Sequence, residues 1–312
     1  MRRLIALSMS VCVVLLLLPS VATSQTADRR YVSLLFGRTQ WVQAENCVRV
    51  TNAVDLGAVS QALRNRGLTA TGNVVLNQVP ASGFWCEGGF SLHPGWDRIQ
   101  QLRQQGWTFV SAGRAYINMA TATYQQAYNN SCGSLPVFAQ RGIDASGLFA
   151  YPNDKYTTAV QTNPVSTCFE WGRTYGTGVN TRSQLEPPWF QSTHTTQGAR
   201  CNMPNAGCPY AAQAKWAYTL PSSIIATIRG LQPGQWYSVQ FYRFVTGANL
   251  DPLDRFRWDC RATDARLHWA TRPEVYCWRD FVSVINALAT ETSAGRVVVT
   301  DPESVAAAWG RA

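Results

Sequence analysis

The three histidines of this chain are the first residues to examine for chemistry, because imidazole serves both as a metal ligand and as a general base. His93, His194 and His268 lie far apart in the sequence and share no ligand spacing. The chain also lacks G-x-S-x-G, H-E-x-x-H, Walker and G-x-G-x-x-G motifs. We therefore interpret each histidine as a surface or structural residue, and the local spacing predicts neither a metal site nor a cofactor.

Carboxylates offer a second kind of chemistry, since glycoside hydrolysis needs two carboxyl groups about 5 to 10 Å apart. The candidate acids are Asp154, Glu170, Asp259 and Asp264. They are separated in sequence, so only the fold can bring two of them into one cleft. Their proximity would favour an enzyme.

Tryptophan is common, at 12 copies, and aromatic faces stack well on the apolar C–H face of a sugar ring. Seven of these side chains fall in loop-like stretches: Trp85, Trp96, Trp189, Trp236, Trp258, Trp269 and Trp278. The alternative for each is core packing, because most tryptophans are largely buried. Glycan binding is therefore a hypothesis that the positions of these side chains must test.

Residues 1–24 have the three parts of a cleavable secretory signal peptide. Arg2 and Arg3 precede an apolar run from residue 4 to residue 18, and small residues at 22–24 precede Gln25. The apolar run is short for a membrane span. We expect cleavage after residue 24, a secreted or cell-envelope location, one domain over 25–312 and no later membrane span.

Cysteine usage agrees with an exported protein, in which an even number of cysteines indicates disulfides. Eight remain after cleavage: Cys47, Cys86, Cys132, Cys168, Cys201, Cys208, Cys260 and Cys277. Eight cysteines allow 105 pairings, so the sequence leaves connectivity open. Short loops favour Cys201–Cys208 and Cys260–Cys277. No closely spaced pair of the zinc-site type is present.

The charge balance is basic, with a net charge of +9 that falls to +7 when Arg2 and Arg3 are removed. Arginine outnumbers lysine 25 to 2. Arginine can bind acidic polymers through two parallel hydrogen bonds. The arginines are nevertheless scattered, whereas a nucleic-acid binder requires a clustered basic face. We therefore predict no nucleic-acid partner and attribute most of the arginine to codon usage.

The elements that must position these residues alternate along the chain. Strands are predicted at 31–36, 69–76, 107–112, 147–151, 167–171, 236–245 and 296–300, and helices at 53–66, 97–105, 121–139, 221–229, 281–288 and after Asp301. Residues 176–215 have no regular pattern and are expected to form a long, disulfide-pinned loop. Strict alternation predicts an α/β protein with a mainly parallel sheet, either open or closed into a barrel.

This order of elements resembles the polysaccharide deacetylase family of carbohydrate esterases, especially its divergent exported actinobacterial members. The resemblance is carried by residues 31–36, 106–111 with 113–119, 148–153, 168–175, 240–243 and 258–260. It implies an irregular (β/α) barrel whose site lies at the carboxyl ends of the strands. It also implies a metal-dependent deacetylase acting on a glycan.

The motif positions depart from that family where its chemistry resides. Gly37 and Arg38 stand where the resemblance places the two aspartates of the first motif. Ala112 and Tyr116 occupy the places of the two histidine ligands, and Tyr242 occupies the place of the last-motif histidine. Metal-assisted deacetylation needs a cation, a bound water and a carboxylate base. We therefore expect no metal and no ordinary deacetylase activity.

The cleft that remains is predicted to hold hydrogen-bonding and stacking groups. These are Arg38, Arg114, Tyr116, Tyr151, Asn153, Asp154, Arg173 and Tyr242. Such groups suit a glycan, including an acidic one. The alternative is a relic cleft that packs on itself through Tyr–Arg and Arg–Asp contacts.

Three functions follow from this sequence. The first is a non-catalytic glycan-binding protein on a deacetylase scaffold. The second is an active esterase or glycan hydrolase with a rebuilt site, for which Asp154, Asp259 and Asp264 are the candidate catalytic residues. The third is an envelope interaction protein whose loops at 176–215 and 250–280 make the contacts. The glycan and the oligomeric state are not determined by the sequence.

Overall fold

The structure is a computed structural model that describes residues 29–89, 91–175, 178–182, 190–195, 197–200, 216–218, 220–250, 258–263, 269–270 and 275–309. The predicted signal peptide, the Cys201–Cys208 pair and Asp264 lie outside these residues. No helix of the described part of the chain is long and apolar enough to cross a membrane.

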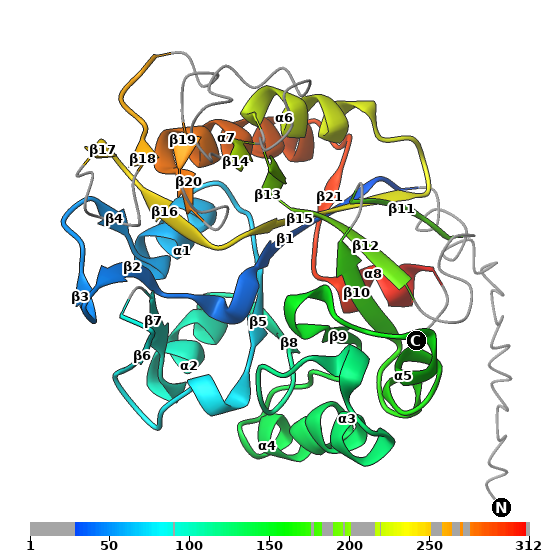
Figure 1. The fold of residues 1–312 in the computed structure, drawn as a ribbon. Coiled ribbons are helices and arrows are strands. Elements are labelled where there is room, and N and C mark those ends of the chain that lie inside the picture. The colour runs from blue at the N-terminus through cyan, green and yellow to red at the C-terminus, as the bar shows by residue number, and fades with distance from the viewer. Residues whose placement is uncertain are drawn as a thin grey trace, which may run out of the picture.

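Seven parallel strands of the described chain close into a barrel (Figure 1). In ring order they are β1 (Tyr31–Phe36), β5 (Thr71–Val74), β8 (Thr108–Ser111), β9 (Leu148–Ala150), β10 (Trp171–Tyr175), β12 (Phe190–Thr195) and β15 (Gln235–Phe241). Pairing of β15 with β1 over their whole length closes the ring. The predicted irregular (β/α) barrel is confirmed by these pairings.

Two short strands extend the sheet beside the ring. β21 (Val298–Val299) runs parallel to the start of β1, and β11 (Val179–Thr181) runs antiparallel to the start of β15. The neighbouring barrel strands β5 and β12 pair with the later halves of the same two strands. Strands therefore change partners along their length, which is the irregularity of this barrel.

Helices cover the outside of the barrel. They are α1 (Leu56–Arg64), α2 (Trp96–Gln104), α3 (Tyr124–Asn130), α4 (Leu135–Gln140), α5 (Thr158–Thr162), α6 (Pro221–Gly230), α7 (Trp278–Ser293) and α8 (Pro302–Ala308). Alternate residues of β1, among them Val32, Leu34 and Phe36, pack into one apolar cluster with α1 and α7. This alternation is what a strand with one helix-covered face requires.

Smaller sheets border the carboxyl ends of the barrel strands. One is ordered β3 (Val48–Arg49), β2 (Val42–Glu45), β7 (Ser91–Pro94), β6 (Phe84–Glu87). The others are β4 (Ala53–Val54) with β16 (Arg243–Val245) and β20 (Val275–Cys277); β17 (Ala248–Asn249) with β18 (Trp258–Asp259) and β19 (Trp269–Ala270); and β13 (Gln197–Arg200) with β14 (Trp216–Tyr218). The sequence patterns did not predict the first of these sheets, which carries part of the site.

Disulfides join segments that are separated in the sequence. Cys47–Cys86 joins the β2–β3 turn to β6 with a Cα–Cα distance of 5.5 Å. Cys132–Cys168 and Cys260–Cys277 have Cα–Cα distances of 5.6 and 5.7 Å. The predicted Cys260–Cys277 bond is confirmed. All three fit an oxidising compartment.

Several predictions of secondary structure were wrong. Residues 176–215 were expected to form an irregular loop, but they contain β11, the barrel strand β12 and β13, because pairing with β10 and β15 overrides a weak local pattern. The helix expected over 121–139 is broken into α3 and α4 around a 3-10 turn at Cys132–Ser134, because Gly133 and Pro136 interrupt it. The strand expected at 167–171 begins only at Trp171. The strand expected at 236–245 is two strands, β15 and β16, separated at Tyr242.

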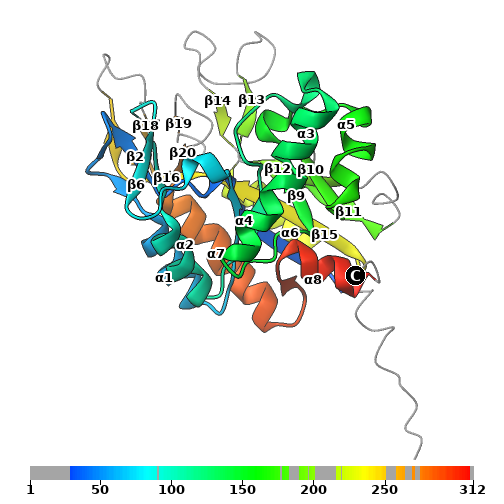
Figure 2. The ribbon, with the colours of Figure 1, turned by 90° about the horizontal axis from the view of Figure 1, so that it is seen from below.

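The amino ends of the barrel strands are closed by aromatic side chains. Trp309, which follows α8, is fully buried, and its ring centroid lies 6.5, 6.3 and 6.1 Å from those of Tyr31, Trp171 and Trp236. Figure 2 shows α8 at the end of the barrel opposite α3. This end is therefore filled with side chains, and the carboxyl ends of the strands form the other, polar end.

Candidate functional site

The polar end of the barrel, here called the mouth, is built from the residues that follow β1, β8 and β9. The loops after β1 and β9 make the same unusual turn. Arg38 and Thr39 have φ of 52° and 46°, and Asn153 and Asp154 have φ of 52° and 54°. Left-handed backbone at non-glycine residues is uncommon and is kept where surrounding contacts hold it. In the first loop, Thr39 Oγ1 donates a 2.8 Å hydrogen bond to the Asn73 carbonyl oxygen on β5.

Arg38 occupies the centre of the mouth, and its side chain is only 12% exposed. Its Nη1 forms an ion pair with Glu87 Oε1, and its guanidinium lies 4.6 Å from the centre of the Tyr116 ring. Burial lowers the pKa of Arg38, but the charges of Tyr116, Glu87 and Tyr242 raise it above its usual value. Arg38 is therefore a fixed positive charge held on two sides by the protein.

Glu87 and His93 form the second layer beneath Arg38. His93 Nε2 lies 3.1 Å from Glu87 Oε2, and His93 Nδ1 lies 3.2 Å from the Arg38 carbonyl oxygen. Burial would raise the pKa of Glu87, but the hydrogen bond from His93 and the charge of Arg38 lower it to about 2. Burial lowers the pKa of His93. Glu87 is therefore ionised at neutral pH and already committed to two partners.

These contacts continue in both directions as a single row across the mouth. On one side the Trp85 ring lies 5.3 Å from the His93 ring. On the other side Tyr116 donates a 2.6 Å hydrogen bond to Asn153 Oδ1. We call this chain of contacts the mouth row; its members are Trp85, His93, Glu87, Arg38, Tyr116 and Asn153.

The barrel interior below the mouth is also polar. Arg173 Nη1 on β10 donates a 2.7 Å hydrogen bond to Gln240 Oε1 on β15, and Asn73 Nδ2 on β5 donates to the same oxygen at 3.2 Å. All three side chains are at most 3% exposed. The predicted ligand-binding residue Arg173 is therefore a buried interior cation, and a ligand at the surface cannot contact it directly.

Tyr151 and Tyr242 are also buried rather than presented to solvent. Tyr151 is 0% exposed and packs over Gly172, where an added Cβ would lie 2.5 Å from its ring. Tyr242 is 6% exposed and packs over Gly37, where an added Cβ would lie 2.1 Å from its ring. The glycines at these positions make room for the rings, so both tyrosines pack inside the protein and are not surfaces that a ligand can contact directly.

Among the predicted ligand-binding residues, Asn153 and Arg114 are exposed and Tyr116 is partly exposed. Arg114 lies beside the mouth, where it lines a groove against α3 together with Asn118, Gln126 and Asn129. Of the predicted ligand-binding residues, Tyr116, Asn153 and Arg114 are therefore the ones that a ligand at or beside the mouth can reach.

The candidate catalytic carboxylates are not brought together. Asp154 follows β9 at the mouth. Asp259 lies on β18, where it forms a 2.8 Å ion pair with Arg261. Glu170 precedes β10 at the opposite end of the barrel, where it interacts with Asp144 and Glu303. The described residues therefore contain no pair of these candidates in one cleft, and Asp264 lies outside them.

The acids at the closed end have a consequence for stability. Burial, followed by the charges of Asp301 and Asp144, raises the pKa of Glu303 to about 7. The folded state then binds more protons than the unfolded state between about pH 4.5 and pH 7, so stability falls as the pH rises through that window. We expect Glu303→Gln to raise the free energy of unfolding by about 2 kcal/mol at pH 8. The variant should also show a weaker dependence of that free energy on pH. Urea unfolding from pH 4 to pH 8 measures both effects. An unchanged slope would show that Glu303 is not the group responsible.

The residues at the mouth do not fit the divalent metal that the deacetylase resemblance implies. No group of three His, Cys, Asp or Glu side chains in the described chain could hold a metal ion. The one carboxylate in the mouth row, Glu87, is bound to Arg38 and His93. Two guanidinium groups, those of Arg38 and Arg173, lie in and below the mouth and oppose a second cation.

The seven loop tryptophans differ in exposure. Trp278 is partly buried against the core, and the side chains of Trp189 and Trp269 lie outside the described part of the structure. Trp96, Trp236 and Trp258 are at most 7% exposed and belong to the core, so the glycan-contact hypothesis is wrong for them. Trp85 is 37% exposed and lies in the mouth row. Sequence reasoning named Trp85 as one loop aromatic among several but missed Glu87 and the role of His93. The alternation of side chains on either side of Cys86 was the sequence signal that could have predicted the hairpin of β6 and β7.

Comparison with known proteins gives structural similarities only. The sequence matches no protein-family model and no curated protein. The chain is similar in structure to a probable polysaccharide deacetylase from Pseudomonas aeruginosa, with 10% identity, a TM-score of 0.47 and coverage of 92% of this chain and 93% of the other. It is similar to the carbohydrate esterase family 4 domain of a xylanase from a Trinervitermes trinervoides hindgut metagenome, with 9% identity, a TM-score of 0.44 and coverage of 91% and 92%.

A third similar structure is a carbohydrate esterase family 4 pseudoenzyme from Bacillus anthracis, with 10% identity, a TM-score of 0.43 and coverage of 89% of this chain and 66% of the other. These proteins carry the names of the family that the sequence resembles. What the present chain can do depends on its own side chains at the mouth.

Proposed function

We propose that this protein is an exported glycan-binding protein on a polysaccharide deacetylase scaffold, without metal-dependent deacetylase activity. The observation that carries the proposal is the mouth row, in which Arg38 is held by Glu87 and Tyr116 at the place where the resemblance expects a cation and its ligands. The row replaces hydrolytic machinery by groups that can stack and form hydrogen bonds.

The ends of the mouth row support a sugar ligand. Trp85 at one end is 37% exposed, and an aromatic side chain can stack on the apolar face of a sugar ring. Asn153 at the other end is exposed, with Tyr116 beside it. An aromatic surface with amide and phenol groups at its far end is a suitable arrangement for one or more sugar rings.

Deacetylation by the family's metal-dependent route is disfavoured by the same residues. That route needs a cation to polarise the carbonyl and a free carboxylate to accept a proton from water. Glu87 is ionised, but its two oxygens are engaged by Arg38 and His93. A base in this state is stabilised by its partners and is poorly placed to accept a proton.

The test is calorimetric titration of the mature protein, residues 25–312, with soluble glycan oligomers, first selected on a glycan array. We expect binding by the wild type and about tenfold weaker binding by Trp85→Ala, because the stacking surface is lost. Tyr124→Ala is the matched control, since Tyr124 is 54% exposed on α3 and lies outside the mouth row. Its affinity should be unchanged.

Two results would count against the proposal in different ways. Zinc binding in the same calorimeter, with acetate released from an acetylated glycan, would favour the active esterase instead. Equal losses in Trp85→Ala and Tyr124→Ala would show that the ligand does not bind at the mouth row.

A further inference from the structure

A second polar pocket lies at the end of the barrel opposite the mouth. Its volume is about 750 Å³, and it is formed where β1 begins, where β21 pairs with it and where α7 ends. Its lining residues are Arg29, Arg30, Thr292, Gly295, Arg296, Val297, Val298 and Val299. None of them belongs to the site described above.

The pocket carries more positive charge than its surroundings neutralise. Arg296 and Arg229 share one carboxylate, Glu291, through ion pairs to its two oxygens. Arg29 and Arg30 have no carboxylate partner within the described part of the chain. The three arginines that line the pocket are therefore not neutralised by Glu291, which is shared with Arg229 outside the lining.

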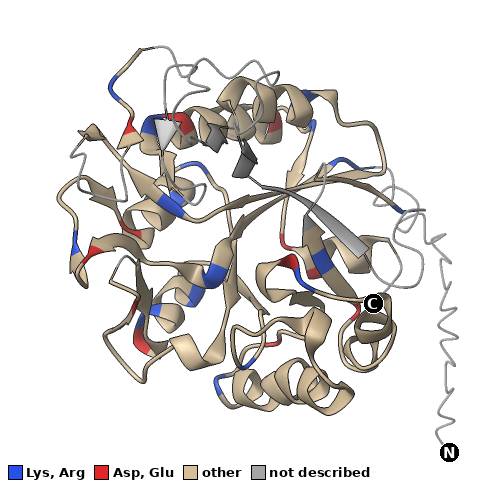
Figure 3. Cartoon of the chain, in the orientation of Figure 1, with Lys and Arg blue, Asp and Glu red and all other residues tan. Residues whose placement is uncertain are grey.

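Contacts within the fold explain the presence of Arg296 in the pocket but not that of Arg29 and Arg30. Arg296 follows the end of α7, where a cation stabilises the exposed carbonyl groups of a helix, and it also binds Glu291. Neither role applies to Arg29 and Arg30, which precede β1. Lys and Arg elsewhere are distributed over many separate elements (Figure 3), so three arginines around one pocket are a local feature.

The pocket also contains an unpartnered hydroxyl. Thr292 Oγ1 is buried and makes no hydrogen bond. Because solvent does not reach this oxygen, a ligand in the pocket can contact Thr292 only through its other atoms, and the arginines are the groups that can bind an anion. The half-buried Val298 and Val299 supply an apolar wall beside it.

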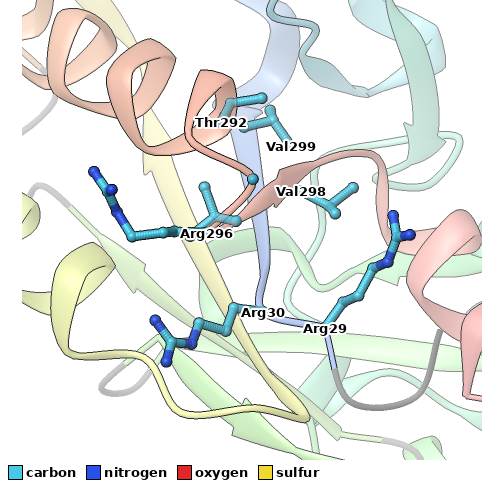
Figure 4. Close-up of a pocket in the computed structure, with 8 residues that line it drawn as sticks. Arg29, Arg30, Thr292, Arg296, Val298 and Val299 are labelled. Carbon is cyan, nitrogen blue, oxygen red and sulfur yellow. The ribbon is translucent and has the colours of Figure 1, made fainter. Parts of the chain in front are cut away.

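The arrangement of the arginines indicates a ligand with more than one negative group. Figure 4 shows the side chains of Arg30 and Arg296 extending to one side of the pocket and that of Arg29 extending to the other, next to Val298. One small anion cannot contact all three guanidinium groups in that arrangement. A chain with successive anionic groups can place one on each side.

We propose that this pocket binds a segment of a phosphate-bearing polymer through Arg29, Arg30 and Arg296. Each guanidinium group presents a planar pair of N–H donors that matches two phosphate oxygens. The site is at the opposite end of the barrel from the mouth row and does not depend on glycan binding there.

The experiment is calorimetric titration of the mature protein with tripolyphosphate, with inorganic phosphate as the single-anion probe. We expect tripolyphosphate to bind about tenfold more tightly than phosphate, since it can occupy both sides of the pocket. The double variant Arg29→Gln/Arg30→Gln should lose at least about tenfold in affinity.

The matched control is Arg64→Gln/Arg103→Gln, which removes the same charge from exposed positions on α1 and α2. It should change the affinity by less than about twofold, because exposed charges at a distance are screened. Absence of tripolyphosphate binding by the wild type, or an equal loss in the control, would overturn the proposal. Glycan affinity at the mouth should be the same in all these variants.

Discussion

Replacing Arg38 by methionine is expected to destabilise the protein by about 2 to 4 kcal/mol, because the change leaves Glu87 as an uncompensated and mostly buried charge. Methionine keeps much of the side-chain length, so the loss reports charge rather than volume. Urea unfolding at pH 7 measures it. The matched control is Arg49→Met, which breaks an exposed ion pair with Asp55 and should cost no more than about 1 kcal/mol.

The Arg38 effect has a specific dependence on pH. The pKa of Glu87 is lowered to about 2 in the folded protein, so its contribution to stability is present above its unfolded pKa of 4.5 and is lost as the pH falls toward 2. The difference between wild type and Arg38→Met should therefore be largest above pH 5 and should shrink on acidification. The double variant Arg38→Met/Glu87→Gln should recover about 2 kcal/mol. Additive losses would show that the two side chains do not stabilise each other.

Replacing Trp309 by alanine is expected to destabilise the protein by about 3 to 5 kcal/mol, the cost of deleting a large buried aromatic side chain. Trp309 contacts Tyr31, Trp171 and Trp236, which come from three different strands of the barrel. Its removal opens the closed end of the barrel. Thermal unfolding followed by circular dichroism should show the loss without interference from tryptophan fluorescence.

Two further variants make this prediction specific. Trp309→Phe keeps an aromatic ring in place and should lose clearly less than Trp309→Ala. Trp85→Ala removes a partly exposed indole at the mouth and should cost about 1 kcal/mol or less. If Trp309→Ala were as mild as Trp85→Ala, the last residues of the chain would not be closing the barrel.

Local patterns located those elements whose signals lie within a few residues. Asp301 caps α8 as predicted, with its side chain accepting a 2.9 Å hydrogen bond from the Ser304 amide. Gly67, after α1, has φ of 65°, as a glycine at a helix end should. The alternation of strands with helices predicted parallel pairing, and the seven barrel strands do pair in parallel. These features depend on near neighbours, so a linear pattern contains them.

The wrong assignments share a different cause. Tyr242 was included in one long strand, but the chain bends there because its ring packs over Gly37, about 200 residues away in sequence. Tyr151 was assigned to the cleft, but Gly172 on the neighbouring strand leaves space for its ring in the core. In both cases the tyrosine ring packs against a glycine that is distant in the sequence, and the absence of a side chain there leaves space for the ring.

By itself the sequence indicated the α/β class and the alternation of strands with helices, and it favoured the Cys260–Cys277 bond without fixing it. The family resemblance alone placed Gly37, Arg38, Ala112 and Tyr116 at the motif positions. Only the tertiary structure decided what Arg38 does, because its partners Glu87 and Tyr116 lie 49 and 78 residues away and reach it from separate elements. Likewise, Arg29 and Arg296 line the same pocket only because β21 pairs with β1. Residue types limit which contacts are possible, whereas long-range packing selects which of them form.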